Sequence, residues 1–339
     1  MLLILVKLRG NMMKDILSVG LIGAGSNAGG HARGIAANEN IRLAAVMDID
    51  RSRAEALATE HKARAYGVLD DLLNDPEVDA VHVCSIHKVH AEQVVAAARA
   101  GKHVLVEKPM ALSVAECDRM IAACEDAGVV LMVGQVMRHF PVNLKVKALI
   151  QEGAIGEVGH MIRRRYGNFD PPDRSWYLDL ELGGVCVLYC FGPHEYDILP
   201  WYIDSPVVKV YSQGSESAER YAGQKDSYST IMNHKDGTVS VLTQTVVTHT
   251  GAHDTYIMGS EGSIWMTNQK LMVNGKEVPV DVTSRVGMPS QIAEFVDCCL
   301  NGKVPDANGR SVRHTMAVIE AVKLSAESGE PVMVNGEDV

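Results

Sequence analysis

Short apolar runs alternate with amphipathic stretches in the first part of the chain. The runs are apolar enough to be buried on both faces, which is typical of parallel strands; they read LSVGLIG, IRLAAVMD, VDAVHVCS, KHVLVE and VVLMVG between residues 17 and 134. Helical patterns separate them, and one of these opens with the capping box Ser113/Glu116 and ends at Gly128. Such alternation predicts an α/β domain with a doubly wound parallel sheet.

The pattern of apolar and polar residues changes after about residue 155. Alternating β-branched segments are joined by Asp236-Gly237, Glu261-Gly262 and Asn274-Gly275, and such pairs favour tight hairpin turns. Two helical patterns follow, over residues 290–300 and 311–328. We therefore expect an α/β domain over residues 15–137 and an α+β domain with a large, open, mostly antiparallel sheet over residues 138–339. Residues 1–14 are interpreted as a leader that belongs to neither domain.

Composition narrows the class of protein. Of 339 residues, 47% are apolar and 22% are charged, as in ordinary globular proteins, and the net charge is −10. The acidic balance argues against nucleic acid or an anionic membrane as partner, and the apolar run MLLILV is too short to span a bilayer. The basic run over residues 163–165 is interpreted as solvated surface. Seven cysteines without a CxxC pair indicate reduced thiols in a cytoplasmic protein.

A glycine-rich turn follows the first apolar run. In the segment GAGSNAGGH, Gly23 allows a tight turn, Gly25 allows the backbone to approach a pyrophosphate, and Ala28 takes the third place of a dinucleotide-binding pattern. Ser26 and Asn27 lie between them and are expected to contact the cofactor, which would sit at the N-terminus of the next helix. The pattern is weak alone, but here it joins a predicted strand to a predicted helix.

The second predicted strand ends in Asp48. An acidic residue at this place accepts hydrogen bonds from the adenosine ribose and disfavours a 2′-phosphate. The sequence therefore favours NAD over NADP, although Arg51 and Arg53 keep NADP as an alternative.

The segment CVLYCFGPHEYD raises three interpretations. Cys186, Cys190 and His194 are four residues apart, so a helix would place them on one stripe. They could hold zinc, move a proton or pack in the core. Helical rise places Cys186 and His194 about 12 Å apart, which is too far for one zinc ion with bonds of about 2.0–2.3 Å. No metal is therefore predicted, and Cys186 is assigned to the core; proton transfer by His194 stays open at this point.

Several motifs occur in the order found in one enzyme family. The chain from about residue 17 onward resembles the Gfo/Idh/MocA family, which includes relatives of glucose–fructose oxidoreductase and inositol dehydrogenase. The resemblance is carried by four segments: Glu107-Lys108-Pro109 after a buried strand, SIHKVH over residues 85–90, GQVMRHFP over residues 134–141, and ESGEPV near the C-terminus. Two departures stand out in the second segment, because Ile86 replaces the usual proline and His87 the usual asparagine.

The resemblance implies a Rossmann domain, an open-sheet substrate domain and a nicotinamide at the cleft between them. It also implies hydride transfer between NAD and a secondary alcohol or ketone of a sugar, inositol or cyclic diol. Lys108 would hydrogen-bond the substrate hydroxyl, and His194 would exchange its proton. Cys190 stands where the family has an aspartate, so it is expected to shape the substrate pocket. The further contacts expected with the cofactor are Ser85, His87, His90 and Glu107, together with Lys108 itself. Those with substrate are Arg138, Tyr166, Trp176 and Asp197, although Asp197, one turn beyond His194, is favoured more as a support of the helix or of the histidine.

Two other functions fit the same residues. The protein could keep NAD tightly bound and use transient oxidation to drive elimination or glycoside cleavage. It could instead be a non-catalytic sensor of NAD and a sugar, which the missing aspartate would favour. By resemblance, a homo-oligomer, dimer or tetramer, is expected to form through the open face of the second sheet.

Overall fold

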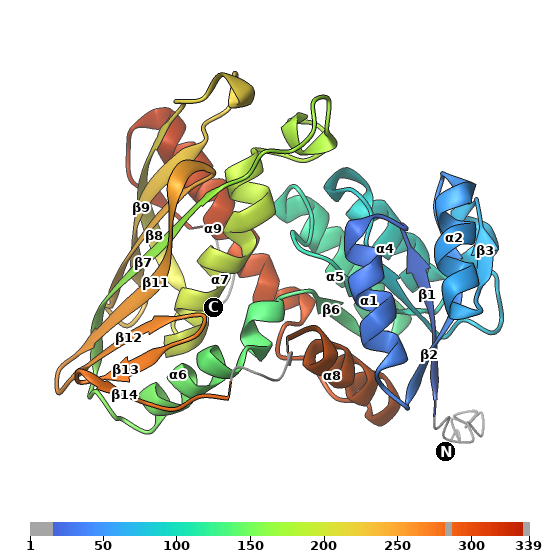
Figure 1. Ribbon diagram of the computed structural model, residues 1–339, viewed down its shortest axis with the longest axis horizontal. Coiled ribbons are helices and arrows are strands. Elements are labelled where there is room, and N and C mark those ends of the chain that lie inside the picture. The colour runs from blue at the N-terminus through green and yellow to red at the C-terminus, as the bar shows by residue number, and fades with distance from the viewer. Residues whose placement is uncertain (1–15, 282–286, 335–339) are drawn as a thin grey trace, which may run out of the picture.

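The computed structural model describes residues 16–281 and 287–334, which form two sheets with helices around and between them (Figure 1). The leader predicted over residues 1–14 lies outside the described residues. Within the described residues, no helix is both long enough and apolar enough to cross a lipid bilayer.

The six-stranded sheet is parallel and has the order β3-β2-β1-β4-β5-β6. Its strands are β1 (Leu17–Ile22), β2 (Ile41–Met47), β3 (Arg64–Tyr66), β4 (Ala80–Val83), β5 (His103–Val106) and β6 (Leu131–Val133). The strand order reverses between β1 and β4, and in open α/β sheets a ligand crevice forms at the carboxyl ends of such strands. The doubly wound prediction is confirmed, but the short edge strand β3 was not predicted because its three residues carry no buried apolar run.

Helices cover both faces of this sheet. One face carries α1 (Ser26–Ala36), α2 (Arg51–His61) and α8 (Gly287–Asn301), and the other carries α3 (Leu69–Leu73), α4 (His90–Arg99) and α5 (Val114–Ala127). The Ser113 hydroxyl caps α5 by accepting from the Glu116 amide at 3.3 Å, while the Glu116 carboxylate accepts from the Leu112 amide at 3.1 Å. Short 3₁₀ turns η1 (His87–Val89) and η2 (Val136–His139) follow β4 and β6.

The nine-stranded sheet has the order β14-β13-β12-β11-β7-β10-β9-β8-β15, and every pair is antiparallel except β7 with β10. Its strands are β7 (Val158–Asn168), β8 (Val207–Ser215), β9 (Ser227–His234), β10 (Val239–Thr245), β11 (Val247–Gly259), β12 (Ser263–Thr267), β13 (Leu271–Val273), β14 (Lys276–Glu277) and β15 (Val332–Met333). The three predicted hairpin turns are confirmed; Gly237, Asn274 and Gly275 adopt positive φ angles of 93°, 51° and 75°.

Three helices fill the space between the two sheets: α6 (Pro141–Gln151), α7 (Gly192–Ile203) and α9 (Gly309–Ser328) (Figure 1). The opposite face of the large sheet carries no helix from the described residues. Three short turns complete the fold: η3 (Trp176–Leu178), the π-helical η4 (Val187–Phe191) and η5 (Glu219–Tyr221).

The last helices return to the first half of the chain. Ile292, Phe295 and Val296 of α8 share a core with β1 and α1, and a Cβ on Gly34 of α1 would come within 2.5 Å of Ile292. Helix α9 packs against α5. The division at residue 137 stays a prediction, since residues after 287 also stabilise the nucleotide-binding half.

The basic run over residues 163–165 is not simply solvated surface. Strand alternation sends Arg163 toward α7, where it is buried and pairs with Glu195, while its Nη1 donates to Thr255 Oγ1 at 2.6 Å. Arg165 faces the same side and lies over the Phe191 ring at 3.7 Å. The prediction for Arg163 is wrong. A buried guanidinium needs a buried carboxylate beside it, and here that carboxylate is distant in sequence, so the strand pattern alone does not reveal it.

Candidate cofactor and catalytic site

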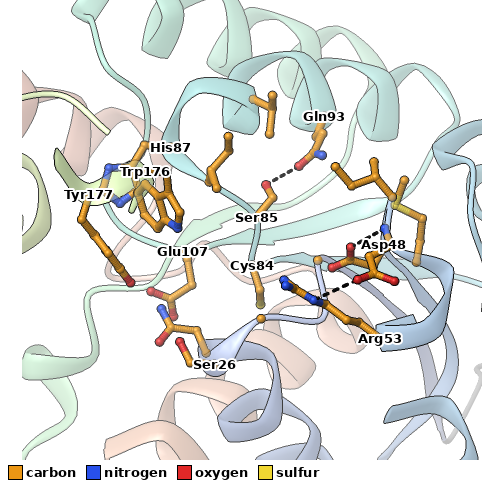
Figure 2. Close-up of a pocket in the computed structure, with 18 of the residues that line it drawn as sticks. Ser26, Asp48, Arg53, Cys84, Ser85, His87, Gln93, Glu107, Trp176 and Tyr177 are labelled. Atoms are coloured by element: carbon orange, nitrogen blue, oxygen red, sulfur yellow. Dashed lines mark hydrogen bonds and ion pairs between the residues drawn. The ribbon is translucent and has the colours of Figure 1, made fainter. Parts of the chain in front are cut away.

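A cavity of about 570 Å³ lies above the carboxyl ends of β1, β2, β4 and β5. Figure 2 shows Asp48 and Arg53 at one end, Trp176, Tyr177 and His87 at the other. The volume falls within the range of small-molecule sites. Its lining contains these sequence-predicted residues: Gly23, Gly25, Ser26, Asn27, Asp48, Ser85, His87, Glu107, Lys108 and Trp176.

The glycine turn has the geometry that an anion site requires. Gly23 has a φ of 91°, and a Cβ there would come within 2.9 Å of the Cys84 backbone. A Cβ on Gly25 would meet nothing within 4 Å, because this position faces the open cavity. Helix α1 starts at the next residue, with no side-chain cap and no acidic residue in its first turn. Its amide groups and helix dipole therefore favour a pyrophosphate. Ala28 is buried in the helix and does not line the cavity.

Asp48 is held by backbone donors. Its Oδ2 accepts from the Ala24 amide at 2.7 Å, and its Oδ1 accepts from the Asp50 amide at 2.8 Å. The carboxylate thus sits beside the glycine turn, where an adenosine ribose would bind. Arg53 lines the same end but pairs with Asp50 at 3.2 Å.

The other end of the cavity is closed by the second half of the chain. The rings of His87 and Trp176 meet edge to face with centroids 4.6 Å apart, and Tyr177 stacks on Trp176 at 3.9 Å. His87 Nδ1 donates to the Gly183 oxygen at 2.9 Å. Burial, with the neighbouring His90, lowers the pKa of His87 to about 3, so this side chain is a neutral contact between the two halves. Tyr177 was not predicted.

Lys108 joins this end of the cavity to the π-helical turn. It lines the cavity, and its Nζ donates to the backbone oxygen of Cys190 at 3.0 Å. The Cys190 side chain is buried and points elsewhere, with its Sγ 3.9 Å from the Sγ of Cys186. Cys186 is in the core, as predicted. The prediction that the Cys190 side chain shapes the pocket is wrong, because the π turn presents its carbonyl instead.

His194 lies in the first turn of α7, directly after the π turn. It is half-buried, and no described residue forms a hydrogen bond with its buried Nδ1. Burial and the positive charge of Lys108 lower the pKa of His194 to about 4. The imidazole is therefore neutral at neutral pH and able to accept a proton. His194 does not line the cavity itself; Lys108, which does, lowers the pKa of His194, and His194 contributes to the lowered pKa of Glu107.

Three residues that were predicted to contact the substrate or the cofactor do not face the cavity but stabilise the elements around it. Arg138 and Asp197 form a buried bidentate ion pair, with Nε–Oδ2 and Nη2–Oδ1 distances of 2.8 and 2.7 Å. Thr315 also donates to Asp197 at 2.9 Å. The prediction that Arg138 binds substrate is replaced by a role in fixing α7, and Asp197 has the supporting role that was favoured for it over a substrate contact. His90 is buried as well, with Nδ1 2.8 Å from the Pro109 oxygen, so it positions the segment after Lys108 rather than the cofactor.

Tyr166 does not reach the cleft. It follows Arg165, which faces the helices, so alternation sends Tyr166 to the opposite face of the large sheet. There its hydroxyl lies 2.6 Å from Thr243 Oγ1. The prediction of a substrate contact is wrong because the sequence did not reveal which face of β7 is inward.

His31 was not singled out by sequence reasoning. It lies on the buried side of α1, and its Nε2 is 2.9 Å from Oε1 of Glu107. A histidine in a helix made mostly of small residues was the available signal. Across residues 16–281 and 287–334, no group of three or more His, Cys, Asp or Glu side chains could hold a metal ion.

The doubly wound sheet, the glycine turn, Asp48 and the lysine at the far end define a dinucleotide-binding oxidoreductase. Family models support this class: the model of the NAD-binding Rossmann fold of the oxidoreductase family GFO_IDH_MocA matches residues 17–135, and that of the GFO/IDH/MocA C-terminal domain matches residues 143–265. The chain belongs to the Gfo/Idh/MocA family of NAD-binding oxidoreductases.

Individual relatives and a solved structure are also similar to this chain. An uncharacterized oxidoreductase of Bacillus subtilis is 32% identical over 60% of this chain and 58% of its own length. The myo-inositol 2-dehydrogenase of Thermotoga maritima is 29% identical over 95% of this chain and 92% of its own. The aldose-aldose oxidoreductase of Caulobacter crescentus, solved with glycerol, superposes with a TM-score of 0.87 at 24% identity, covering 94% of this chain and 99% of that one. The last likeness shows the fold.

Proposed function

We propose that the protein is an NAD-dependent dehydrogenase that transfers hydride between the nicotinamide and a secondary alcohol or ketone of a polyhydroxylated substrate. The observation that carries this is the placement of Lys108. Lys108 follows Glu107, which lies away from Asp48 in the cavity (Figure 2), and its ammonium group is tethered to the turn that leads into His194. With adenosine at Asp48 and pyrophosphate at Gly25, the nicotinamide would reach the Lys108 end.

Bound NAD would accept or return the hydride, and the chain's own residues transfer the proton. Lys108 donates a hydrogen bond to the substrate oxygen and stabilises the negative charge that develops there. His194, neutral because its pKa is about 4, takes the hydroxyl proton during oxidation. The reverse reaction, ketone reduction, uses the same groups in the opposite direction.

The class of substrate follows from the aromatic wall and from relatives. Trp176 and Tyr177 present stacked rings beside the reacting end, and ring faces pack well against the C–H groups of a sugar or cyclitol. The relative matched over 92% of its length is named for myo-inositol. A sugar, an inositol or a cyclic diol is therefore the proposed substrate.

A panel assay tests the proposal against its two rivals. The enzyme is incubated with NAD and with sugars, inositols, glycosides and cyclic diols, and the absorbance of reduced nicotinamide is followed. A dehydrogenase forms NADH in proportion to oxidised product. Turnover of a glycoside without net NADH would favour transient oxidation with retained cofactor. NAD binding without turnover of any compound would favour a sensor.

We also propose that two copies pair through the helix-free face of the large sheet. Apolar side chains form one row in register across six strands of that face: Tyr211, Ile231, Val241, Ile162, Tyr256 and Trp265. Ile231 and Tyr256 are 44% and 45% exposed, and such contiguous apolar rows favour association. An Ile231→Glu variant should sediment as a monomer while the wild type sediments as a dimer or tetramer. Wild-type protein that sediments as a monomer at micromolar concentration would contradict the proposal.

A further inference from the structure

A buried chain of three polar side chains runs beneath the cofactor cavity. His31 of α1 lies between His82 of β4 and Glu107 at the end of β5, with Nδ1–Nδ1 and Nε2–Oε1 distances of 3.1 and 2.9 Å. His31 and His82 are fully buried, and Glu107 is 6% exposed. The other carboxylate oxygen of Glu107 accepts from the Lys108 amide at 3.2 Å. The helix that would hold the pyrophosphate is thus tied directly to the segment that carries Lys108.

The directions of the hydrogen bonds among these three side chains determine which of them are charged. A carboxylate only accepts, so His31 Nε2 carries a proton toward Glu107. One of the two facing Nδ1 atoms must donate to the other. Burial and the neighbouring His31 lower the pKa of His82 well below its usual value, so His82 is neutral. Cys84 and Glu107 raise the pKa of His31 to about 10 against the effect of burial, so the shared proton is assigned to His31 Nδ1. His31 then carries both protons and forms an ion pair with Glu107.

The electrostatic environment supports this assignment. Burial alone would lower the pKa of His31, but Cys84 and Glu107 beside it raise that pKa. Burial alone would raise the pKa of Glu107, but the hydrogen bond and charge of His31, with smaller effects of Lys108 and His194, lower it to about 2. A buried carboxylate remains ionised only when it is compensated in this way.

The carboxylate of Glu107, which is the negative member of this ion pair, lies on the cavity side. Figure 2 shows it between Ser26 and Tyr177. Among the described residues that line the cavity, Asp48 and Asp50 lie at the adenosine end, and Glu107 is the acidic residue toward the other end. Lys108 brings a positive charge to that end, which would repel an oxidised nicotinamide. A fixed carboxylate offsets it and stabilises the cationic ring, because charges interact strongly in a partly desolvated cleft.

We infer that the His31–Glu107 ion pair makes the cofactor site selective for the oxidised, positively charged nicotinamide over the reduced, neutral one. Glu107 supplies the charge, and His31 is the positioning residue that keeps it ionised and in place. The inference rests on the proposed placement of the nicotinamide at the Lys108 end, but not on the identity of the substrate.

Calorimetric titration of the apoprotein with NAD⁺ and with NADH tests this without catalysis. Glu107→Gln keeps the shape of the side chain and should raise the ratio of the NAD⁺ dissociation constant to the NADH dissociation constant about tenfold, as expected for loss of one nearby opposite charge. His31→Gln should change the ratio in the same direction. Asp48→Asn is the matched control: it should weaken both forms alike, since the adenosine ribose is common to them.

A second measurement covers the case in which His31→Gln fails to fold. Nitrogen-15 NMR of the wild-type apoprotein should show both nitrogens of His31 protonated at neutral pH. A neutral His31, or an unchanged ratio in a folded Glu107→Gln protein that binds both forms, would overturn the inference and leave the proposed function standing. Wild-type protein that bound neither dinucleotide would overturn both.

Discussion

The Nζ of Lys108 donates its hydrogen bond to the backbone oxygen of Cys190, 3.0 Å away, and not to the cysteine side chain. The position where the family has an aspartate therefore contributes through its main chain. The thiol itself points to Cys186 in the core. Although the family's carboxylate is absent, Lys108 still has a fixed hydrogen-bond partner, and His194 lies in the next helical turn.

Removing the Cys190 thiol should have little effect on turnover. Cys190→Ala keeps the backbone acceptor, so kcat should stay within about threefold of wild type, with a loss of about 1 kcal/mol in unfolding free energy for the vacated volume. Steady-state kinetics and denaturant unfolding measure both, with Cys186→Ala as the neighbouring control. A loss of two orders of magnitude in kcat would show that the thiol itself takes part.

The activity should persist in mild acid. Substrate oxidation needs neutral His194, and a base is lost as pH falls through its pKa. Because burial and Lys108 lower that pKa to about 4, the acid limb of kcat/KM should lie well below the value near 6.5 of an ordinary histidine. The profile is measured with a true substrate at constant ionic strength, with His194→Gln as the variant that lacks this limb. A wild-type limb at or above the ordinary value would argue against His194 as the base.

Cofactor choice should depend on Asp48. Its carboxylate is fixed by the Ala24 and Asp50 amides, so it would repel a 2′-phosphate. Asp48→Ser should raise kcat/KM with NADP relative to NAD by about tenfold, the effect of one lost like charge. An unchanged preference would mean that Arg53 or the loop after β2, and not the carboxylate, decides between the two cofactors.

The Arg138–Asp197 pair should matter for stability rather than for binding. Asp197→Asn removes the bidentate carboxylate of a buried guanidinium and leaves it the more distant carboxylate of Asp306 at 3.5 Å, so it should lower the unfolding free energy by about 3 kcal/mol. The exposed pair Arg42–Glu77 offers the control, since Glu77→Gln should cost at most about 0.5 kcal/mol. Chemical denaturation measures both. If Asp197→Asn kept full stability but raised KM severalfold, a substrate contact of this pair would be supported instead.

Local patterns predicted most of the fold. Runs buried on both faces marked five of the six parallel strands, and Asn274-Gly275 marked a hairpin because both residues adopt positive φ angles. The edge strand β3 was missed because its three residues are only partly buried. The return of α8 to pack on α1 was also missed, since contacts between residues 34 and 292 leave no trace in a local pattern.

The structure brings more of the residues predicted for the cofactor into one cavity than of those predicted for the substrate. Gly23, Gly25, Asp48 and Lys108 occupy strand ends, where the topology alone brings residues together. Arg138 failed as a predicted substrate contact because its role depends on a partner in another element. The π turn before α7 shifted the Cys190 side chain away from the pocket, and a stripe counted on an ideal helix could not anticipate that shift.

The most direct test of the proposed chemistry is single-turnover NADH formation by Lys108→Ala beside wild-type enzyme, with saturating NAD and a substrate found in the panel. Lys108 stabilises the developing negative charge on the substrate oxygen, so the variant should bind NAD at least as tightly as the wild type yet form NADH about a thousandfold more slowly. Lys108→Arg should retain part of the rate. Lys108→Ala protein that formed NADH at the wild-type rate would contradict the account.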